Sequence, residues 1–282
     1  MCLRASFHDL GCCGRVAAAA ILGLALAGPG AAATPDATTA PEVSGRPNGQ
    51  PPTTDVPAAE TADAADRPGL TIDREAGFVE LDATVIGHGC EWLELVACTP
   101  GSREHEALVT IDAKPSDLHL ALLLLGLEAG KPQTGVRGED GWIILPPTGP
   151  VVDLHFVLPA ADDAPAQAET VAPVESWVFD RAADAVLPDT PGGWIFTGSR
   201  LVRDRRDPES PEVYLADVNG TAVSLVHFGD ETIGRDTAVT ESDDGQNLAP
   251  HAEAMPPNGT KIRLRISRMA PDDPHAKAPP AP

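Results

Sequence analysis

Alternating apolar and polar positions predict a domain rich in β-strands. The clearest alternation runs from Thr260 to Arg268, where Ile262, Leu264 and Ile266 share one face. Shorter runs of apolar and β-branched residues predict six further strands, at 78–86, 92–97, 107–111, 151–158, 176–179 and 194–199. The pattern therefore predicts a core built mainly from sheet.

A β-hairpin is the strongest local prediction. Two alternating runs lie on either side of Asn219-Gly220, within residues 212–228. Asn-Gly is typical of a type I′ turn, which requires positive φ at both central positions. This pairing places Tyr214 opposite Leu225 on one face.

The strand at 260–268 carries an outward row of basic residues, Lys261, Arg263 and Arg265. We interpret the row as neutralising acidic neighbours and protecting an edge strand. An anion-binding face is the alternative.

One segment has the features of an α-helix. Pro115-Ser116-Asp117 places a proline and an acidic residue in its first turn, and Gly126 follows its last leucine. Six leucines between 118 and 125 cover every side, so we expect this helix to be buried nearly all round. Many strands around one buried central helix predict an α+β fold class, in a single β-rich domain.

The N-terminal residues 1–33 have the pattern of a secretory signal peptide. A start with Arg4 and Arg15 leads into the apolar run Val16–Ala27, then a glycine–proline break and small residues up to Ala33. The run is shorter than the roughly 20 apolar residues of a membrane-spanning helix. An uncleaved N-terminal anchor is the alternative. No other segment is long and apolar enough to span, so we expect an exported protein of the periplasm or cell envelope, or a secreted one, without a transmembrane span after cleavage.

Composition divides the rest of the chain into a linker, a domain and a tail. Residues 34–69 hold no aromatic residue and have seven prolines between positions 35 and 68, which predicts a disordered, extended linker. All ten aromatic residues beyond the signal segment fall between Phe78 and Phe228. We therefore expect a folded domain at 70–268 and a disordered tail at 269–282.

The charge of the chain excludes one class of partner. Acidic residues number 42 against 20 basic ones, a formal charge of −22. Residues 1–33 carry +1 and residues 34–69 carry −4, so −19 belongs to the domain and tail. Nucleic-acid binding is excluded because affinity for phosphate backbones comes mainly from Lys and Arg. The acidity is interpreted as a solubilising surface, with binding of calcium or a cationic polymer as the alternative.

Only Cys90 and Cys98 remain after removal of the signal segment. An extended chain between them separates their Cα atoms by roughly 26 Å, and a helix by about 12 Å. A disulfide needs less than about 7 Å, so we expect no bridge between them. Two cysteines also cannot supply the four ligands of an ordinary iron–sulfur cluster, so no such cofactor is expected.

No common catalytic signature occurs, neither a Gly-x-Ser-x-Gly elbow, nor a nucleotide-binding glycine loop, nor His-Glu-x-x-His. The densest polar constellation consists of Cys98, Glu104, His105, Glu106, Asp112 and His119. These side chains could satisfy the backbone groups of a tight turn. They could also bind a divalent metal, or form a Cys–His pair that activates the thiol.

Several motifs of the chain resemble the YdjY-domain family of bacterial extracytoplasmic proteins. They are Cys98-Thr-Pro-Gly-Ser-Arg-Glu-His-Glu-Ala-Leu108, Lys114-Pro-Ser-Asp-Leu-His119, Gly130-Lys-Pro132, Trp177-Val-Phe-Asp180, Trp194-Ile-Phe-Thr-Gly-Ser199 and Tyr214-Leu-Ala-Asp-Val-Asn-Gly220. The resemblance covers roughly residues 70–268 and implies an exported or envelope location, without an established activity. It also implies that Glu104, His105, Glu106 and His119 match the polar motif of the family. Some members are labelled ferredoxin-like, a label that the cysteines of this chain do not support.

Two functions remain open on these grounds. The first is a non-catalytic binding or accessory module on a flexible stalk, with an envelope protein or polymer as partner. The second is a metal-dependent or thiol enzyme that uses Cys98, His105, Glu106 and His119. An accessory role for an envelope redox complex is suggested by the family label alone.

The signal-peptide pattern makes a direct prediction. Expression of the full chain in a host that exports it is expected to yield a mature protein beginning at Thr34, because the small residues before that position form the cleavage site. N-terminal sequencing of the purified protein checks this. An intact Met1 in the membrane fraction would instead establish the uncleaved anchor.

Overall fold

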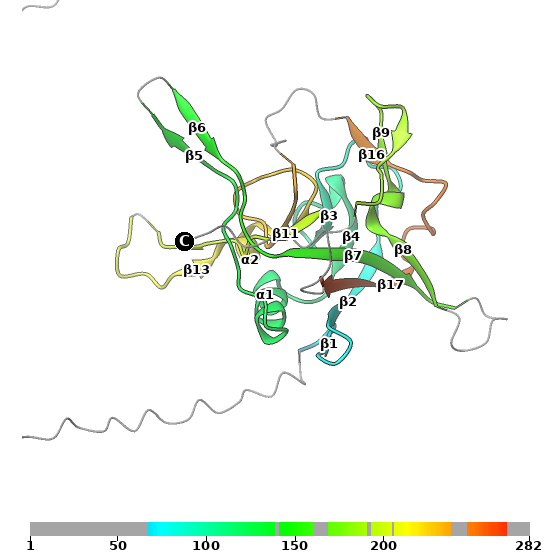
Figure 1. The fold of residues 1–282 in the computed structure, drawn as a ribbon, viewed down its shortest axis with the longest axis horizontal. Coiled ribbons are helices and arrows are strands. Elements are labelled where there is room, and N and C mark those ends of the chain that lie inside the picture. Colours follow the sequence, from blue (N-terminus) through cyan, green and yellow to red (C-terminus); the bar gives the residue numbers. More distant parts are fainter. Residues whose placement is uncertain are drawn as a thin grey trace, which may run out of the picture. The chain divides into compact units, whose positions relative to one another are not determined.

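The computed structural model describes residues 67–138, 141–160, 169–190, 193–204, 206–237 and 247–269. The expected signal segment, residues 34–66 of the expected linker and residues 270–282 of the expected tail lie outside these ranges. The described residues form a β-barrel with short helices and two projecting arms (Figure 1).

Eight strands follow one another around the barrel: β2 (Phe78–Val85), β17 (Lys261–Arg268), β7 (Val151–Leu158), β11 (Trp194–Phe196), β15 (Ile233–Arg235), β14 (Thr221–Ser224), β3 (Leu95–Cys98) and β4 (Ala107–Ile111). Pairing of β2 with β4 closes the ring, with Ala83 opposite Ile111 and Val85 opposite Val109. Two more strands extend the edges of β2 and β7, namely β1 (Leu70–Asp73) and β8 (Thr170–Pro173).

The remaining elements lie around this barrel. A three-stranded sheet consists of β10 (Ala185–Val186), β9 (Val178–Asp180) and β16 (Leu248–Pro250). Two ribbons consist of β5 (Thr134–Arg137) with β6 (Trp142–Leu145), and of β12 (Leu201–Val202) with β13 (Val213–Tyr214). The helices are α1 (Pro115–Leu124) and α2 (Leu215–Asn219), with single 3-10 turns η2 (Glu104–Glu106) and η3 (Val174–Trp177).

Side chains fill the barrel interior, as expected for eight strands. Alternate residues of β2 and β17 point inward, among them Leu81, Leu264 and Ile266, all fully buried. The predicted alternation of the last strand is therefore confirmed. Phe156 on β7 stacks on Trp177 of η3 with ring centroids 4.0 Å apart, which joins the barrel to the smaller sheet.

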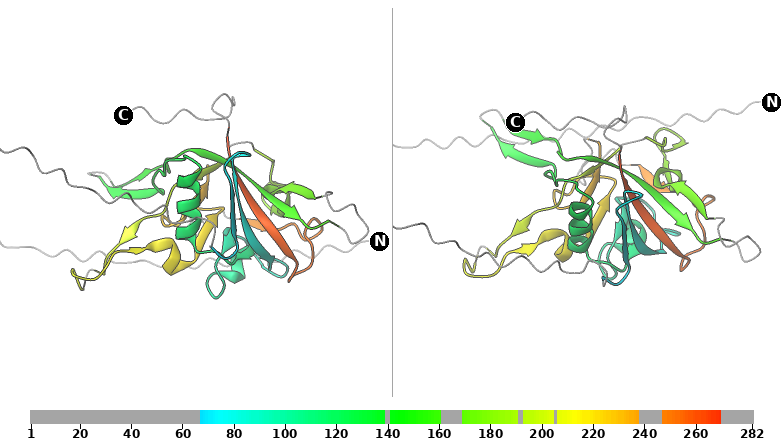
Figure 2. Two further views of the ribbon diagram at one scale, coloured as in Figure 1. Left: turned by 90° about the horizontal axis from the view of Figure 1, so that it is seen from below. Right: turned by 60° about the horizontal axis from the view of Figure 1, so that its bottom comes forward.

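The expected α+β fold with a central helix is wrong. The structure is a closed barrel, and α1 packs beside its strands, against β1, β2, β14 and α2 (Figure 2). Leu118 and Leu122 are buried, but Leu123 is 42% exposed, so the helix is not buried all round. Leucine on every side indicated burial, whereas only one side of the helix meets the core.

The start of α1 is held by a residue from another helix. No side chain of its own N-cap residue, Lys114, bonds to the helix. Instead the Asp217 carboxylate of α2 accepts hydrogen bonds from the Ser116 backbone N–H at 2.8 Å and its hydroxyl at 2.6 Å. A carboxylate at this end of a helix is favourable because free N–H groups and the helix dipole both point at it.

The expected hairpin at 212–228 is also wrong. Asn219 ends α2, and Gly220 follows in the left-handed region at φ 75°. Positive φ is required at the residue after a helix as well as in a type I′ turn, so the same Asn-Gly dipeptide serves either structure. Strand β14 pairs with β3 and β15 instead of with residues 212–216.

Strand β17 lies inside the sheet instead of at an edge, between β2 and β7. Two residues of its basic row, Arg263 and Arg265, do neutralise acidic neighbours. The nearly buried Glu80 carboxylate of β2 forms ion pairs with the guanidinium groups of Arg263 and Arg265, each with an N–O distance of 2.6 Å. Both arginines also pair with Glu169. The protection of an edge was therefore the wrong part of the interpretation.

Replacing Glu80 tests how much this cluster of ion pairs contributes to stability. Glu80→Gln is expected to lower the free energy of unfolding by about 1–3 kcal/mol, because two guanidinium groups lose a buried charged acceptor. Glu169→Gln is the matched control, since this carboxylate is exposed and its loss should change stability by less than about 1 kcal/mol. Urea denaturation of both variants measures the difference, and equal effects would contradict the assignment.

Candidate functional site

Two short loops between parallel strands form the candidate site. Strands β3 and β4 are parallel neighbours joined by residues 99–106, and β14 and β15 are parallel neighbours joined by residues 225–232. Parallel neighbours usually need a longer, helical connection. The two loops meet where the Arg103 guanidinium lies 4.1 Å from the centroid of the Phe228 ring.

Two of the predicted site residues, Cys98 and Glu106, are buried at the two ends of the first loop. Cys98 is fully buried beside Leu95 and Ala107. Burial raises the pKa of its thiol from 9.0 to about 11, against weaker opposing hydrogen bonds. Glu106 is nearly buried, and its carboxylate lies 3.2 Å from Arg103. The Cys98 thiol is therefore protonated at neutral pH. Since the deprotonated thiolate is the nucleophilic form, Cys98 is unreactive in the folded protein.

The other predicted site residues are less enclosed or lie elsewhere. Glu104 accepts a hydrogen bond from the Gly101 backbone N–H at 2.6 Å, which closes the turn. The His105 imidazole is 3.6 Å from Glu106, but its side chain is 73% exposed. Asp112 is exposed after β4. Within the described ranges, no group of three or more histidine, cysteine or acidic side chains is arranged to hold a metal ion.

His119 has a separate set of partners. Its Nδ1 atom lies 2.9 Å from the Tyr214 hydroxyl and 3.1 Å from the Gly198 carbonyl oxygen, which also accepts a hydrogen bond from Tyr214 at 3.0 Å. The imidazole packs edge-on against the rings of Tyr214 and Phe196. Burial lowers the pKa of His119, so the ring is neutral at neutral pH. These contacts fasten β13 to α1.

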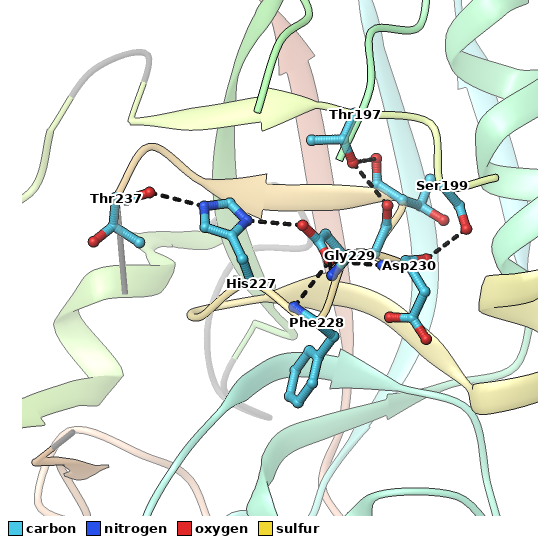
Figure 3. A network of polar contacts seen from close by, with 9 residues as sticks. Thr197, Ser199, His227, Phe228, Gly229, Asp230 and Thr237 are labelled. Carbon is cyan, nitrogen blue, oxygen red and sulfur yellow. Dashed lines mark hydrogen bonds and ion pairs between the residues drawn. The ribbon is translucent and has the colours of Figure 1, made fainter. Parts of the chain in front are cut away.

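A buried network that the sequence interpretation missed fixes the second loop (Figure 3). Glu231 is fully buried, and one carboxylate oxygen lies 2.8 Å from Nδ1 of His227. The other ring nitrogen lies 2.9 Å from the Thr237 carbonyl oxygen. Both ring nitrogens of His227 therefore have a polar partner inside the fold.

The second oxygen of Glu231 satisfies the turn itself. It accepts backbone hydrogen bonds from Phe228 at 3.2 Å, Gly229 at 2.8 Å and Asp230 at 3.1 Å. In the segment after β11, Thr197 donates a hydrogen bond to the Glu231 carbonyl at 2.7 Å and Ser199 donates one to the Asp230 carbonyl at 2.5 Å. The backbone of this loop therefore has polar partners on both sides.

Asp230 is the least satisfied group of the network. Asn219 donates a hydrogen bond to one carboxylate oxygen, while the other oxygen is buried without a hydrogen-bond partner. Burial is the main cause that raises the pKa of Asp230. The run His227-Phe-Gly-Asp-Glu-Thr232, which follows a buried apolar strand, was the sequence signal for this network.

The arrangement chemically favours support of the backbone over reaction. Cys98, Glu106, Asp230 and Glu231 are all nearly or fully buried. The cysteines in the described residues, Cys90 and Cys98, both have free thiols.

The fold and the site define a closed β-barrel in which two pairs of parallel neighbouring strands are joined by short loops. A model of the YdjY domain matches residues 70–267, which is most of the chain. The chain therefore belongs to the YdjY family. Neither a curated protein nor a solved structure matches it. No helix in the described part of the chain is long and apolar enough to cross a membrane.

Thiol labelling tests the state of Cys98. At pH 8 the native protein is expected to hold about a hundredfold less thiolate at Cys98 than a thiol of pKa 9.0 would, so labelling by iodoacetamide should be slowed at least that much relative to the urea-unfolded chain. Peptide mass spectrometry resolves the site, with half-buried Cys90 as the internal comparison. Equal rates in the two states would reinstate a reactive thiol.

Asp230→Asn tests the buried carboxylate. Because burial raises the pKa of Asp230, folding takes up a proton there, and wild-type stability rises as pH falls through the folded-state pKa. The variant carries no charge to bury, so it is expected to unfold a few degrees higher than the wild type at pH 7. The difference in unfolding temperature between the variant and the wild type should disappear as the pH approaches 3.8, the ordinary pKa of an aspartate. Thermal unfolding at several pH values measures it, and a variant less stable at pH 7 would contradict the assignment.

Proposed function

We propose that the chain is an exported protein of the cell envelope whose YdjY domain acts as a non-catalytic binding or accessory module on a flexible stalk. The signal-peptide pattern and the proline-rich residues 34–69 support export and the stalk. The burial of the polar networks supports a structural role for the candidate site. The observation that carries the proposal is the distribution of exposed apolar side chains.

Nine of the eleven large apolar side chains that are exposed in the described residues lie on two ribbons and two helices. This apolar face consists of Leu123, Val136, Trp142, Ile143, Ile144, Leu145, Leu201, Val213 and Val218. The ribbons β5–β6 and β12–β13 project from the same side of the barrel, as Figures 1 and 2 show. Single exposed apolar residues are ordinary, but a set gathered on one side marks an interaction surface.

The β5–β6 arm is the centre of this face. Trp142 is 70% exposed, and the three residues after it are exposed as well. Successive residues of a strand point to opposite sides, so both surfaces of the arm are apolar. Tryptophan is among the side chains that contribute most to binding, and we therefore expect Trp142 to be an anchor for the envelope partner, a protein or a polymer.

Substitution on the arm tests the proposal. Trp142→Ala in the mature chain is expected to weaken binding to isolated cell envelopes at least tenfold, a loss typical of an interface anchor. Cosedimentation over a range of protein concentrations measures the affinity. The matched control is Val171→Ala, an exposed apolar residue on β8 outside the apolar face.

Both variants should unfold at the temperature of the wild type, since each side chain is exposed. Equal envelope affinity for Trp142→Ala and the wild type would remove the arm from the binding function. Loss of affinity in Val171→Ala would show that the effect is not specific to the apolar face.

A further inference from the structure

The free edge of β6 leads to a further inference that goes beyond the proposed function. In the described residues β6 pairs with β5 alone, so the backbone groups along its other edge have no strand partner. An isolated two-stranded hairpin is at best marginally stable in water. An uncharged strand such as Trp142-Ile-Ile-Leu145, left open at an edge, pairs readily with another strand.

The hydrogen-bond pattern of the arm shows which residues face the open edge. The Gly138 N–H donates to the Gly141 carbonyl at 2.7 Å, so these two residues form a hydrogen-bonded pair. Such pairs alternate with non-hydrogen-bonded pairs along an antiparallel ladder. Trp142, opposite Arg137, is therefore in a non-hydrogen-bonded pair, as is Ile144 two residues on. The backbone N–H and C=O groups of Trp142 and Ile144 point to the open edge.

We propose that β6 of a second copy of this chain occupies this edge, antiparallel and related by a two-fold axis at Ile143. Trp142 of each copy then lies opposite Ile144 of the other, and both pairs exchange two backbone hydrogen bonds. The two Ile143 side chains meet on the axis in the closer, non-hydrogen-bonded pair. The result is one four-stranded sheet shared by two copies, a self-complementary interface of the commonest symmetry.

The other edge of the arm is less suited to such pairing. Strand β5 contains Gly135, which weakens a strand, and Arg137, which would bring a charge to the interface. Trp142 also covers Gly135, because a Cβ atom there would come within 3.2 Å of the indole ring. The uncharged β6 edge is therefore the better partner.

Charge favours the same place for self-association. The full chain carries −22, and −19 of this charge belongs to the domain and tail, so two copies repel wherever their acidic surfaces approach. Strand β6 contains no charged side chain, and the arm that carries it projects from the barrel (Figure 1). Salt screens charges beyond about 8–10 Å, so two copies joined through their arms avoid most of the repulsion. Anionic lipid would meet the same net negative charge.

The size of the interface sets its strength. The five exposed apolar side chains of the arm present on the order of 500 Å². Pairing along one edge covers only part of this area, because the side chains point to both surfaces of the arm, whereas a standard interface buries roughly 800 Å² on each partner. We therefore expect a weak dimer with a dissociation constant in the micromolar range, roughly 1–100 μM.

Opposite charges at the axis test the proposal. Sedimentation velocity of the mature chain is expected to show conversion of monomer to dimer between about 1 and 200 μM. Ile143→Lys and Ile143→Glu should each stay monomeric, because like charges meet directly on the axis. An equimolar mixture of the two variants should restore the dimer. Val171→Lys, exposed on β8, is the control and should dimerise like the wild type.

Three outcomes would overturn the dimer: a wild type that is monomeric at 200 μM, an Ile143→Lys variant that dimerises normally, or a mixture that stays monomeric. A monomeric wild type whose envelope binding still requires Trp142 would show that another molecule occupies the edge, and the proposed function would stand. A dimer whose envelope binding ignores Trp142 would support the self-pairing and contradict the proposed function alone.

Discussion

The path of the chain through the barrel depends on a carboxylate at the turn between β14 and β15. These two strands are parallel neighbours, yet only residues 225–232 connect them. A turn this short leaves backbone N–H groups without strand partners, and a buried unpaired N–H costs about as much as a lost hydrogen bond. Glu231 accepts three of these groups with one oxygen and contacts His227 with the other. The loop can therefore be both short and buried.

Hydrogen bonding of irregular backbone also explains the other buried polar residues that looked like candidates for catalysis. Glu106 contacts Arg103, and Arg103 in turn covers Phe228 from the second loop. His119 holds Tyr214 and the Gly198 carbonyl together. Each group solves a local problem of hydrogen bonding at a place where the chain leaves regular structure. Asp230, with one buried oxygen that lacks a hydrogen-bond partner, is where this solution is least complete.

Local patterns predicted the longest strands and the helix at 115–124, but neither most of the short elements nor the arrangement. The strands at 107–111 and 151–158 have their predicted bounds, and Ile262, Leu264 and Ile266 point inward as the alternation indicated. Barrel closure could not be predicted, because it depends on the pairing of β2 with β4 and β17 and no short pattern encodes a partner. The strands at 213–214 and 233–235 are too short for alternation to identify. Asn219-Gly220 supplied the right backbone conformation for the wrong element.

For the site, the sequence indicated the Cys98 loop but not Glu231, since nothing local tells a buried carboxylate from a solvated one.

The position of β17 in the ring has a consequence for the order of folding. The last strand of the domain pairs along nearly its whole length with β2 and with β7, so it lies between strands made much earlier in the chain. Contacts between residues so distant in sequence make folding slow, since a long loop must close before they form. The barrel cannot be completed until residues 261–268 are available. Whether the chain emerges from a ribosome or, as proposed above, from an export channel, the barrel stays open until this last strand is available.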